Sequence, residues 1–341
     1  LITLVDKKQG GDLLGRVTSV RHKIAQDLGL IIPPVRIRDD VTLRPNEYVI
    51  KLKGVEVSRG EVMPGRLLAI NPGTATESIE GLKGREPAFG LEAVWITPDH
   101  KEEAEIKGYS VVAPTAVIAT HLSEVIRSNA DVLLNRQIVK NLIDIVKEKY
   151  PAVVEDLSKY LSVGDVQKVL QKLIKERVPI RDLVTIFEAL ADHAPSIKEI
   201  DQLVEKVRQA LSRTISKQYE DEKGTIYCVT LSPRLEQTIM QWTHDAYSIP
   251  MDAESIEALC RSISDWVEKF VSKGREPVIL CSSNVRPHLR RLLSPIFPKL
   301  AILSYQEISP HTKVESMGVI DIEVEPVGVG KEKAGVTNES Q

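Results

Sequence analysis

The chain has 341 residues, of which 42% are hydrophobic and 27% charged, and its net formal charge is -3. These values fit a soluble globular protein of two or three domains, and the near balance of charge argues against a protein that binds nucleic acid through bulk electrostatics. No run of about 18 consecutive apolar residues is present, so the sequence predicts no membrane-spanning helix.

The first residues have the character of a linker. Residues 1–12 join an apolar LITLV to DKKQGGD, and the chain opens without Met. We interpret this as the start of a fragment, whose missing part could be membrane-bound. Apolar residues then repeat at helical spacing over 13–29, and Gly29 suits a C-terminal cap, which predicts a helix there.

Short strands follow this helix. Residues 35–39 and 48–62 alternate apolar and polar side chains, and Gly54 interrupts the second run, which predicts a hairpin or a bulge. Residues 66–71 and 91–97 have the pattern of two further strands. The stretch between those two is rich in glycine and proline, which predicts a loop.

From Thr115 onward the pattern is helical for about 100 residues. Ser162 and Asp165 resemble a capping box with Asp in place of Glu, and Ser196 and Glu199 resemble another. These signals predict helices that begin just after each serine.

The last section alternates strands and helices. It starts with a strand at 225–231, and Ser232 then caps a helix that has Pro233 at its first position. Such alternation predicts a small α/β domain with a partly parallel sheet. Residues 326–341 lack core side chains, which predicts a disordered tail.

The fold class predicted from these patterns is a multi-subdomain α/β protein, with a β-rich insertion in its N-terminal region, a central helical region and a small C-terminal α/β domain. The predicted parts are a linker at 1–12, an α/β region at 13–114 with its insertion at about 62–108, a helical subdomain at 115–178, a helical subdomain with a strand at 179–250, an α/β subdomain at 251–325 and the tail.

The stretch MPGRLLAINPGTA at 63–75 invites comparison with a phosphate-binding loop. A P-loop needs a lysine after its second glycine and a helix after the loop, and this stretch has neither. Its Asn-Pro-Gly sequence is typical of a turn that follows a strand. We therefore predict a strand held between two turns.

No other motif carries chemistry. No pair among the seven histidines has the spacing of a helical zinc site, and Cys281 ends an apolar strand, as a core residue would. The arginines at 286, 290 and 291 could bind phosphate, but a solvated helix face is the stronger expectation. The sequence thus predicts no catalytic residue, no metal site and no cofactor.

Several blocks carry a family likeness. They are GRLLAINPG, PAFGLEAVWI, GYSVVAPTAVIATHL and, above all, KVLQKLIKERVPIRDLVTIFEALADHAP. From about residue 4 to residue 324 the chain resembles the C-terminal cytoplasmic region of the flagellar type III export-gate (FlhA) family.

The resemblance implies a non-enzymatic domain at the cytoplasmic side of the bacterial inner membrane, joined to an N-terminal membrane half. It implies four subdomains and assembly into a nine-membered ring. The implied partners are flagellar export chaperones with filament-type substrates, and other export-apparatus proteins including the ATPase complex. No nucleic acid is implied.

The family's chaperone site uses an Asp, a Phe three positions later, and a Thr. Carried onto this sequence, the Asp is Asp131, the Phe position is Leu134 and the Thr position is Asp165. Leu keeps an apolar group without a ring, and Asp adds charge, so two of the three positions depart from the family. The resemblance also implies that the linker contacts a neighbouring subunit through Leu1, Ile2, Leu4 and Val5.

Other roles for these residues stay open. Asp131 and Leu134, three positions apart, share a helix face, and Leu134, Ile138, Leu142 and Ile145 form a row on it, although Asp131 could instead be a solvated or capping acid. An exposed row would suit a partner helix, whereas a buried one would make Leu134 core.

Three alternatives concern function. Asp165 could serve only as the capping acid that faces Ser162. The chain could also be the equivalent domain of a virulence injectisome. The third alternative is that the chain is an enzyme that acts on a phosphorylated ligand.

Overall fold

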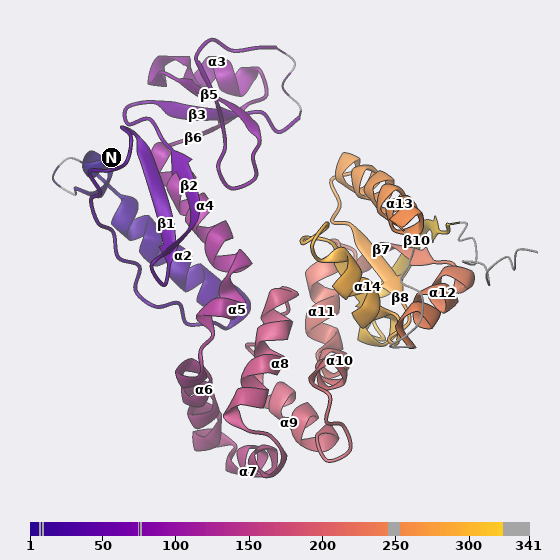
Figure 1. Cartoon of the computed structure of the whole chain (residues 1–341). Coiled ribbons are helices and arrows are strands. Elements are labelled where there is room, and N and C mark those ends of the chain that lie inside the picture. The colour runs from indigo at the N-terminus through magenta and orange to yellow at the C-terminus, as the bar shows by residue number, and fades with distance from the viewer. Residues whose placement is uncertain (7, 9, 74, 76, 245–252, 323–341) are drawn as a thin grey trace, which may run out of the picture. The chain divides into compact units, whose positions relative to one another are not determined.

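The computed structural model describes residues 1–6, 8, 10–73, 75, 77–244 and 253–322, so the predicted tail lies outside the described residues. The chain divides into unit 1, Leu1–Phe187, and unit 2, Glu188–Gln341, and each is described by itself. The structure combines helices with three sheets, and residues 114–219 form helices with no strand among them, which confirms the predicted fold class (Figure 1). Within the described ranges, no helix is both long enough and apolar enough to cross a membrane.

Unit 1 begins with a helical layer. Helix α1 (Ile2–Val5) leads into α2 (Leu13–Leu28), which packs against α4 (Pro114–Ser128). Strands β1 (Glu47–Leu52) and β2 (Val55–Glu61) form an antiparallel hairpin beside these helices (Figure 1). Its turn uses Lys53 and Gly54 at positive φ, which confirms the hairpin predicted at Gly54, and its register also shifts between Ile50 and Lys51.

The strand predicted at 35–39 is wrong. Residues 33–40 have no regular secondary structure, and the side chain of Ile37 is exposed. The alternating pattern alone did not suffice, because a strand also needs a neighbour to receive its backbone hydrogen bonds.

The β-rich insertion is a four-stranded antiparallel sheet in the order β4-β5-β3-β6. One face packs in a cluster with Val117 of α4, and the other packs against Ala104 of α3. Strand β4 lies in the stretch predicted to be a loop. The elements are β3 (Leu67–Ile70), β4 (Leu82–Arg85), β5 (Glu92–Ile96), η2 (Pro98–His100), α3 (Lys101–Ile106) and β6 (Ser110–Val112).

A buried histidine joins the hairpin to α4. The Tyr48 hydroxyl lies 2.8 Å from Nδ1 of His121, and Ser58 Oγ lies 2.7 Å from Nε2. His121 is only 2% exposed, and this burial lowers the pKa of its ring. The folded state therefore holds the imidazole neutral, with a hydroxyl at each nitrogen.

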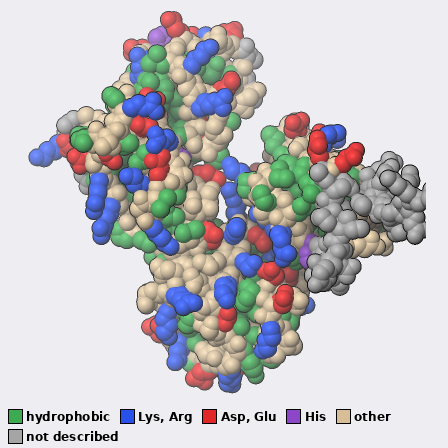
Figure 2. Space-filling view, viewed as in Figure 1, with side chains coloured by type: hydrophobic (Ala, Val, Ile, Leu, Met, Phe, Trp, Pro, Cys, Tyr) green, Lys and Arg blue, Asp and Glu red, His purple; other side chains and the backbone are tan. Residues whose placement is uncertain are grey.

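Short helices complete unit 1. They are α5 (Ala130–Leu133), α6 (Arg136–Lys149), α7 (Pro151–Tyr160) and α8 (Val163–Lys175), and α9 (Leu183–His193) crosses the boundary between the units. Helix α8 packs against both α5 and α6. On the face seen in Figure 2, acidic and basic side chains intermix, with no large area of one sign.

Helix α2 ends against the segment that follows α8. Gly29 caps α2 in the left-handed conformation, with φ 76°, and the Ile180 N–H donates to the Leu28 carbonyl at 2.8 Å. A Cβ on Gly29 would lie 2.7 Å from the backbone nitrogen of Arg181. Both the conformation and the close approach require glycine here.

Unit 2 contains helices around one sheet. Helices α10 (Ile200–Ala210) and α11 (Ser212–Tyr219) come first, followed by α12 (Pro233–His244), α13 (Ala253–Ser272) and α14 (Arg286–Leu293). The described strands run parallel in the order β10-β7-β8-β9. All of their pairings are parallel, whereas the sequence predicted a partly parallel sheet. The strands are β7 (Thr225–Leu231), β8 (Val278–Cys281), β9 (Ala301–Ser304) and β10 (Lys313–Ile320), and η3 (Tyr305–Glu307) follows β9.

Two local predictions in unit 2 differ from the structure, and one holds. Ser232 Oγ accepts the Leu235 N–H at 3.1 Å, which confirms the predicted cap of α12. The second capping box is wrong, because α10 starts at Ile200 and the Ser196 hydroxyl instead donates to the His193 carbonyl. Strand β7 pairs with β8 and β10, so it belongs to the C-terminal sheet and not to the preceding helical subdomain. The finer subdomain boundaries stay predictions.

A buried group of four charges joins three elements of unit 2. Arg208 of α10 donates to both carboxylate oxygens of Glu307, at 3.1 and 2.6 Å. Arg286 of α14 donates through Nε to Glu205 at 2.7 Å, and the same Nε lies 3.3 Å from Glu307. These four residues, which we call the charge quartet, sum to zero net charge.

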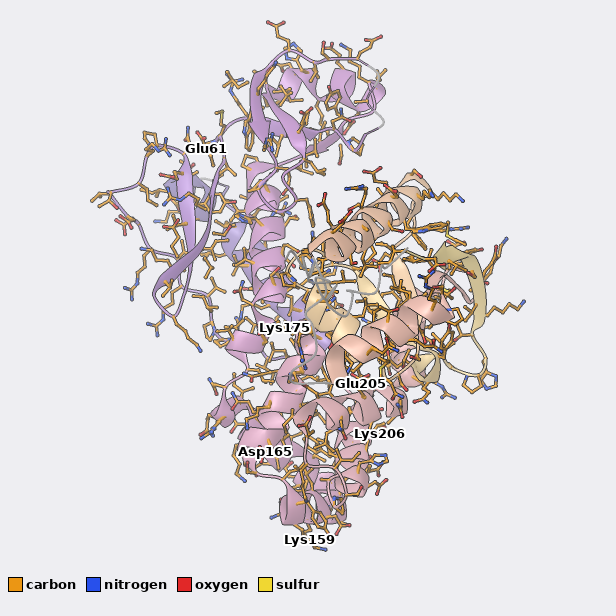
Figure 3. The ribbon with its side chains drawn as sticks, turned by 45° about the vertical axis from the view of Figure 1, so that its right-hand side comes forward. Glu61, Lys159, Asp165, Lys175, Glu205 and Lys206 are labelled. Atoms are coloured by element: carbon orange, nitrogen blue, oxygen red, sulfur yellow. The ribbon has the colours of Figure 1, made fainter. Side chains whose placement is uncertain are left out.

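The charge quartet corrects the prediction for Arg286. Its side chain is 1% exposed, so it belongs to no solvated helix face. Figure 3 labels Glu205, its partner on α10. Burial raises the pKa of Glu205, against the opposing influence of the nearby Arg286. Charges as deeply buried as these are tolerated only when each has a partner.

We expect Gly29→Ala to lower the free energy of unfolding by about 1–3 kcal/mol, because a Cβ there strains the backbone and meets Arg181. Gly15 is the matched control: it lies in α2, and an added Cβ meets nothing within 4 Å. Gly15→Ala should raise stability by about 0.5–1 kcal/mol. Urea denaturation of both variants checks this, and equal effects would contradict the role given to Gly29.

We expect Arg286→Met to lower the free energy of unfolding by about 3–5 kcal/mol, because it leaves the buried Glu205 without its partner. Arg291 is exposed on the same helix as Arg286 and pairs at 3.5 Å with Asp201 of α10, so Arg291→Met should change stability by less than about 0.5 kcal/mol. Denaturant titration of the two variants makes the comparison, and a small loss for Arg286→Met would refute the importance of the quartet.

We expect stability to fall with acid because of His121. Its pKa in the folded chain is lowered from 6.5, so below that pH the unfolded chain binds more protons than the folded chain. This part of the stability is complete above pH 6.5 and is lost as the pH falls toward the lower folded pKa. Urea midpoints between about pH 5 and about pH 7.5 should drop less in His121→Gln, which cannot titrate. Parallel profiles would show that His121 has no such effect.

Candidate functional site

The predicted site lies where α5 meets α6. Asp131 is in α5, and Leu134 is the residue that caps its C-terminus. Asn135 then caps α6, because its side chain accepts the Ile138 N–H at 3.0 Å. The chain therefore turns between Leu134 and Asn135, and the predicted single helix face through both helices is wrong. We call this stretch, residues 130–138, the α5–α6 corner.

The side chain of Leu134 is fully buried, with 0% exposure. It is therefore a core residue in this conformation and cannot offer the exposed apolar contact that the sequence suggested. The rest of the predicted row is mixed, since Leu142 is 6% exposed and Ile145 is 52% exposed. The exposed apolar side chain nearest in sequence to Asp131 is its neighbour Val132, at 42%.

Asp131 remains a candidate contact. Its side chain is half-buried, and its carboxylate has no hydrogen bond or ion pair with any described residue. A carboxylate that is partly removed from water keeps unused acceptor sites, and a donor from a partner can fill them. Its neighbour in sequence, Val132, is exposed, but consecutive residues of a helix project in different directions.

Two glutamine side chains of α8 donate hydrogen bonds to backbone carbonyls of the α5–α6 corner. Gln167 Nε2 donates to the Leu134 carbonyl at 2.9 Å. Gln171 Nε2 donates to the same carbonyl at 3.1 Å and to the Asp131 carbonyl at 3.0 Å. The sequence search missed both residues, although their spacing of four places them on one face of the helix.

Asp165 acts as a helix cap. It accepts the Ser162 N–H at 3.2 Å, and Ser162 Oγ accepts the Asp165 N–H at 3.2 Å, so the predicted capping box of α8 is confirmed. The hydrogen bond from the Ser162 hydroxyl lowers the pKa of Asp165. Figure 3 labels Asp165 in the first turn of α8 and Lys175 at its end.

The N-terminal residues contact their own chain. Leu1 and Leu4 pack against the cluster that contains Trp95 and Val117, whereas Ile2 is 73% exposed. Val5 is half-buried. Contact of these four residues with a neighbouring subunit stays a prediction.

The glycine-rich stretch at 63–75 is a strand between turns, as predicted. Asn71 Oδ1 accepts the Gly73 N–H at 2.8 Å, directly after β3, and Gly73 has a φ of 92°. Cys281 ends β8 with 0% exposure, and burial raises the pKa of its thiol, which confirms a core residue. Across the described ranges, no three His, Cys, Asp or Glu side chains lie close enough to hold a metal ion.

Comparisons with known proteins agree with the resemblance seen in the sequence. A model of the FHIPEP family matches residues 1–313. The flagellar biosynthesis protein FlhA of Bacillus subtilis (strain 168) is 44% identical over 326 residues, which cover 94% of this chain and 48% of that protein. The chain thus spans about half the length of the curated relatives it matches.

Solved structures share the fold. The Chlamydia pneumoniae CdsV protein superposes with a TM-score of 0.81 at 25% identity, covering 92% of each chain. The nonameric EscV cytosolic domain from the type III secretion system gives a TM-score of 0.69 at 23% identity, covering 91% of this chain and 93% of that one. At 23% identity, the second match speaks for the fold alone. The chain therefore belongs to the FHIPEP family, whose model matches it from the first residue to the start of β10.

Proposed function

We propose that this chain is the cytoplasmic docking platform of a flagellar type III export apparatus. It binds export chaperones that carry filament-type substrates, and it takes part in their ordered export. The proposal places the rest of the whole protein in the bacterial inner membrane. It assigns no catalytic step to this domain, whose task is to bind and release partners.

The observation that carries the proposal is the carboxylate of Asp131, which makes no hydrogen bond or ion pair with the residues that the structure describes. It is half-buried, fixed on a short helix and adjacent to the exposed Val132. Interfaces gain most of their affinity from a few such anchored contacts, where an apolar group lies beside a polar group with a defined direction. A half-buried acceptor of this kind suits a hydrogen-bond donor on a chaperone, and the exposed Val132 offers a separate apolar contact.

A flagellar role is favoured over an injectisome role by sequence identity. The FlhA relative is 44% identical to this chain, whereas the EscV domain is 23% identical. This chain shares its fold with the EscV domain, so the fold does not separate the two roles and the higher identity to FlhA does. That difference supports flagellar chaperones as the partners.

We also propose that the domain assembles with copies of itself into a nine-membered ring and meets other export proteins there, including the ATPase complex. The nonameric state of the EscV domain supports this idea by its shared fold. The exposed Ile2 leaves the N-terminal segment one apolar side chain for a neighbouring subunit. Analytical sedimentation of the domain, with its N-terminal segment (residues 1–12) present, tests ring formation.

We expect Asp131→Ala to weaken the binding of a flagellar chaperone–substrate complex by about tenfold, because it removes the acceptor on which the proposed contact depends. Titration calorimetry with complexes from the same organism measures this. The fold should survive, since Asp131 makes no side-chain bond within the described chain. Leu134→Ala is a poor test, because removing a fully buried leucine costs about 2–5 kcal/mol of stability.

Asp156 supplies the matched control. It is an exposed acid of α7 in unit 1, paired at 2.7 Å with Lys159. Asp156→Ala should leave chaperone affinity unchanged. If Asp131→Ala binds every flagellar chaperone tested as tightly as the unaltered chain, Asp131 is not the docking residue.

A further inference from the structure

The carbonyl of Leu134 is the centre of an unusual arrangement at the α5–α6 corner. It lies just beyond the last turn of α5, where backbone carbonyls have no partner within their own helix. Its partners are two side-chain amides from another helix, those of Gln167 and Gln171, at 2.9 and 3.1 Å. A buried backbone carbonyl needs such donors, and here the sequence supplies two of them.

Gln171 also reaches the residue that carries the proposed function. The same Nε2 atom lies 3.0 Å from the carbonyl of Asp131. One amide therefore joins the backbone of Asp131 to the backbone of Leu134 and ties both to α8. The direction of a short helix such as α5, with only four residues, depends on contacts of this kind because its own hydrogen bonds are few.

Helix α8 is a firm support for these amides. The capping box of Ser162 and Asp165 fixes its first turn. The side chains on its inner face are buried, namely Val166, Val169, Leu170, Leu173 and Ile174. Gln167 and Gln171 lie next to this face and are half-buried, so their amides have a defined place.

We propose that Gln171, assisted by Gln167, is a positioning residue of the docking site: its amide fixes the backbone from Asp131 to Leu134 and thereby sets where the Asp131 carboxylate meets a partner. This inference rests on the proposed function. Neither glutamine needs to touch the chaperone, because each acts through the placement of Asp131.

A double-mutant cycle tests the inference. Gln171→Met keeps the length of the side chain and removes the amide donor. We expect it to weaken binding of the chaperone–substrate complex by about threefold to tenfold. In the Asp131→Ala background the same substitution should cause no further loss, because the group that it positions is gone.

Two further variants serve as controls. Gln167→Met leaves both hydrogen bonds of Gln171 in place, so it should fold normally and weaken binding less than Gln171→Met. Gln209→Met removes an amide on α10 of unit 2, which bonds to Gln306 at 2.6 Å, and should leave chaperone affinity unchanged. Urea midpoints of all variants separate a loss of folding from a loss of binding.

Each outcome has one meaning. An equal loss from Gln171→Met with and without Asp131 overturns the inference, because the glutamine would then act on the fold as a whole. Unchanged or tighter binding by Gln171→Met overturns it as well. If Asp131→Ala alone binds the chaperone–substrate complex normally, the proposed docking site is wrong. This result is distinguishable from a failure of the inference about Gln171, because it appears in the single Asp131 variant.

Discussion

The hydrogen bonds from α8 to the carbonyls of Leu134 and Asp131 are the constraint on which the candidate site depends. Without them, α5 would be one turn of helix between two longer ones, free to take several directions. With them, the corner has one geometry, and a half-buried acid lies at a fixed place on it. The capping box at the start of α8 belongs to the same construction, because it fixes the helix that supplies the donors. Asp165 thus contributes to the site through structure.

In unit 2, charged side chains fix a junction between elements. Its sheet is parallel, and the helix α10 and the segment after β9 meet where Arg208, Arg286, Glu205 and Glu307 are buried. Loss of one partner from such a group destabilises the fold, because it leaves a buried charge uncompensated. Polar side chains thus fix a junction within each unit, at the α5–α6 corner of unit 1 and at the charge quartet of unit 2.

The sequence predicted local features well. The cap of α8, the glycine that ends α2 and the hairpin at Gly54 depend on residues within a few positions of each other, so their signals are readable in the chain. The family likeness led to Asp131. Features that depend on distant partners were missed. Arg286 finds Glu205 across 81 positions, and Gln171 finds Asp131 across 40, and neither distance leaves a trace in a local pattern.

The strand predictions also failed where the structure depends on distant partners. Residues 35–39 have the side-chain alternation of a strand yet no regular structure, while the Leu-Lys-Gly-Arg of β4 has little strand character and pairs with β5. A pairing partner decided both cases, and a partner is a property of the fold. The break after Leu134 was missed for a related reason. The apolar row continues across it, and the cap by Asn135 was the only local signal of the turn.

The contact between Leu28 and Ile180 has a consequence for how unit 1 forms during synthesis. Its hydrogen bond joins the end of α2 to a segment made long afterwards, beyond α8. Since chains emerge from the ribosome in order, at about 5–20 residues per second, α2 waits several seconds for the residue that closes it. During that time its apolar face, including Ile24 and Leu28, lacks part of its final cover. Unit 1 can complete itself only when the chain has reached the boundary with unit 2.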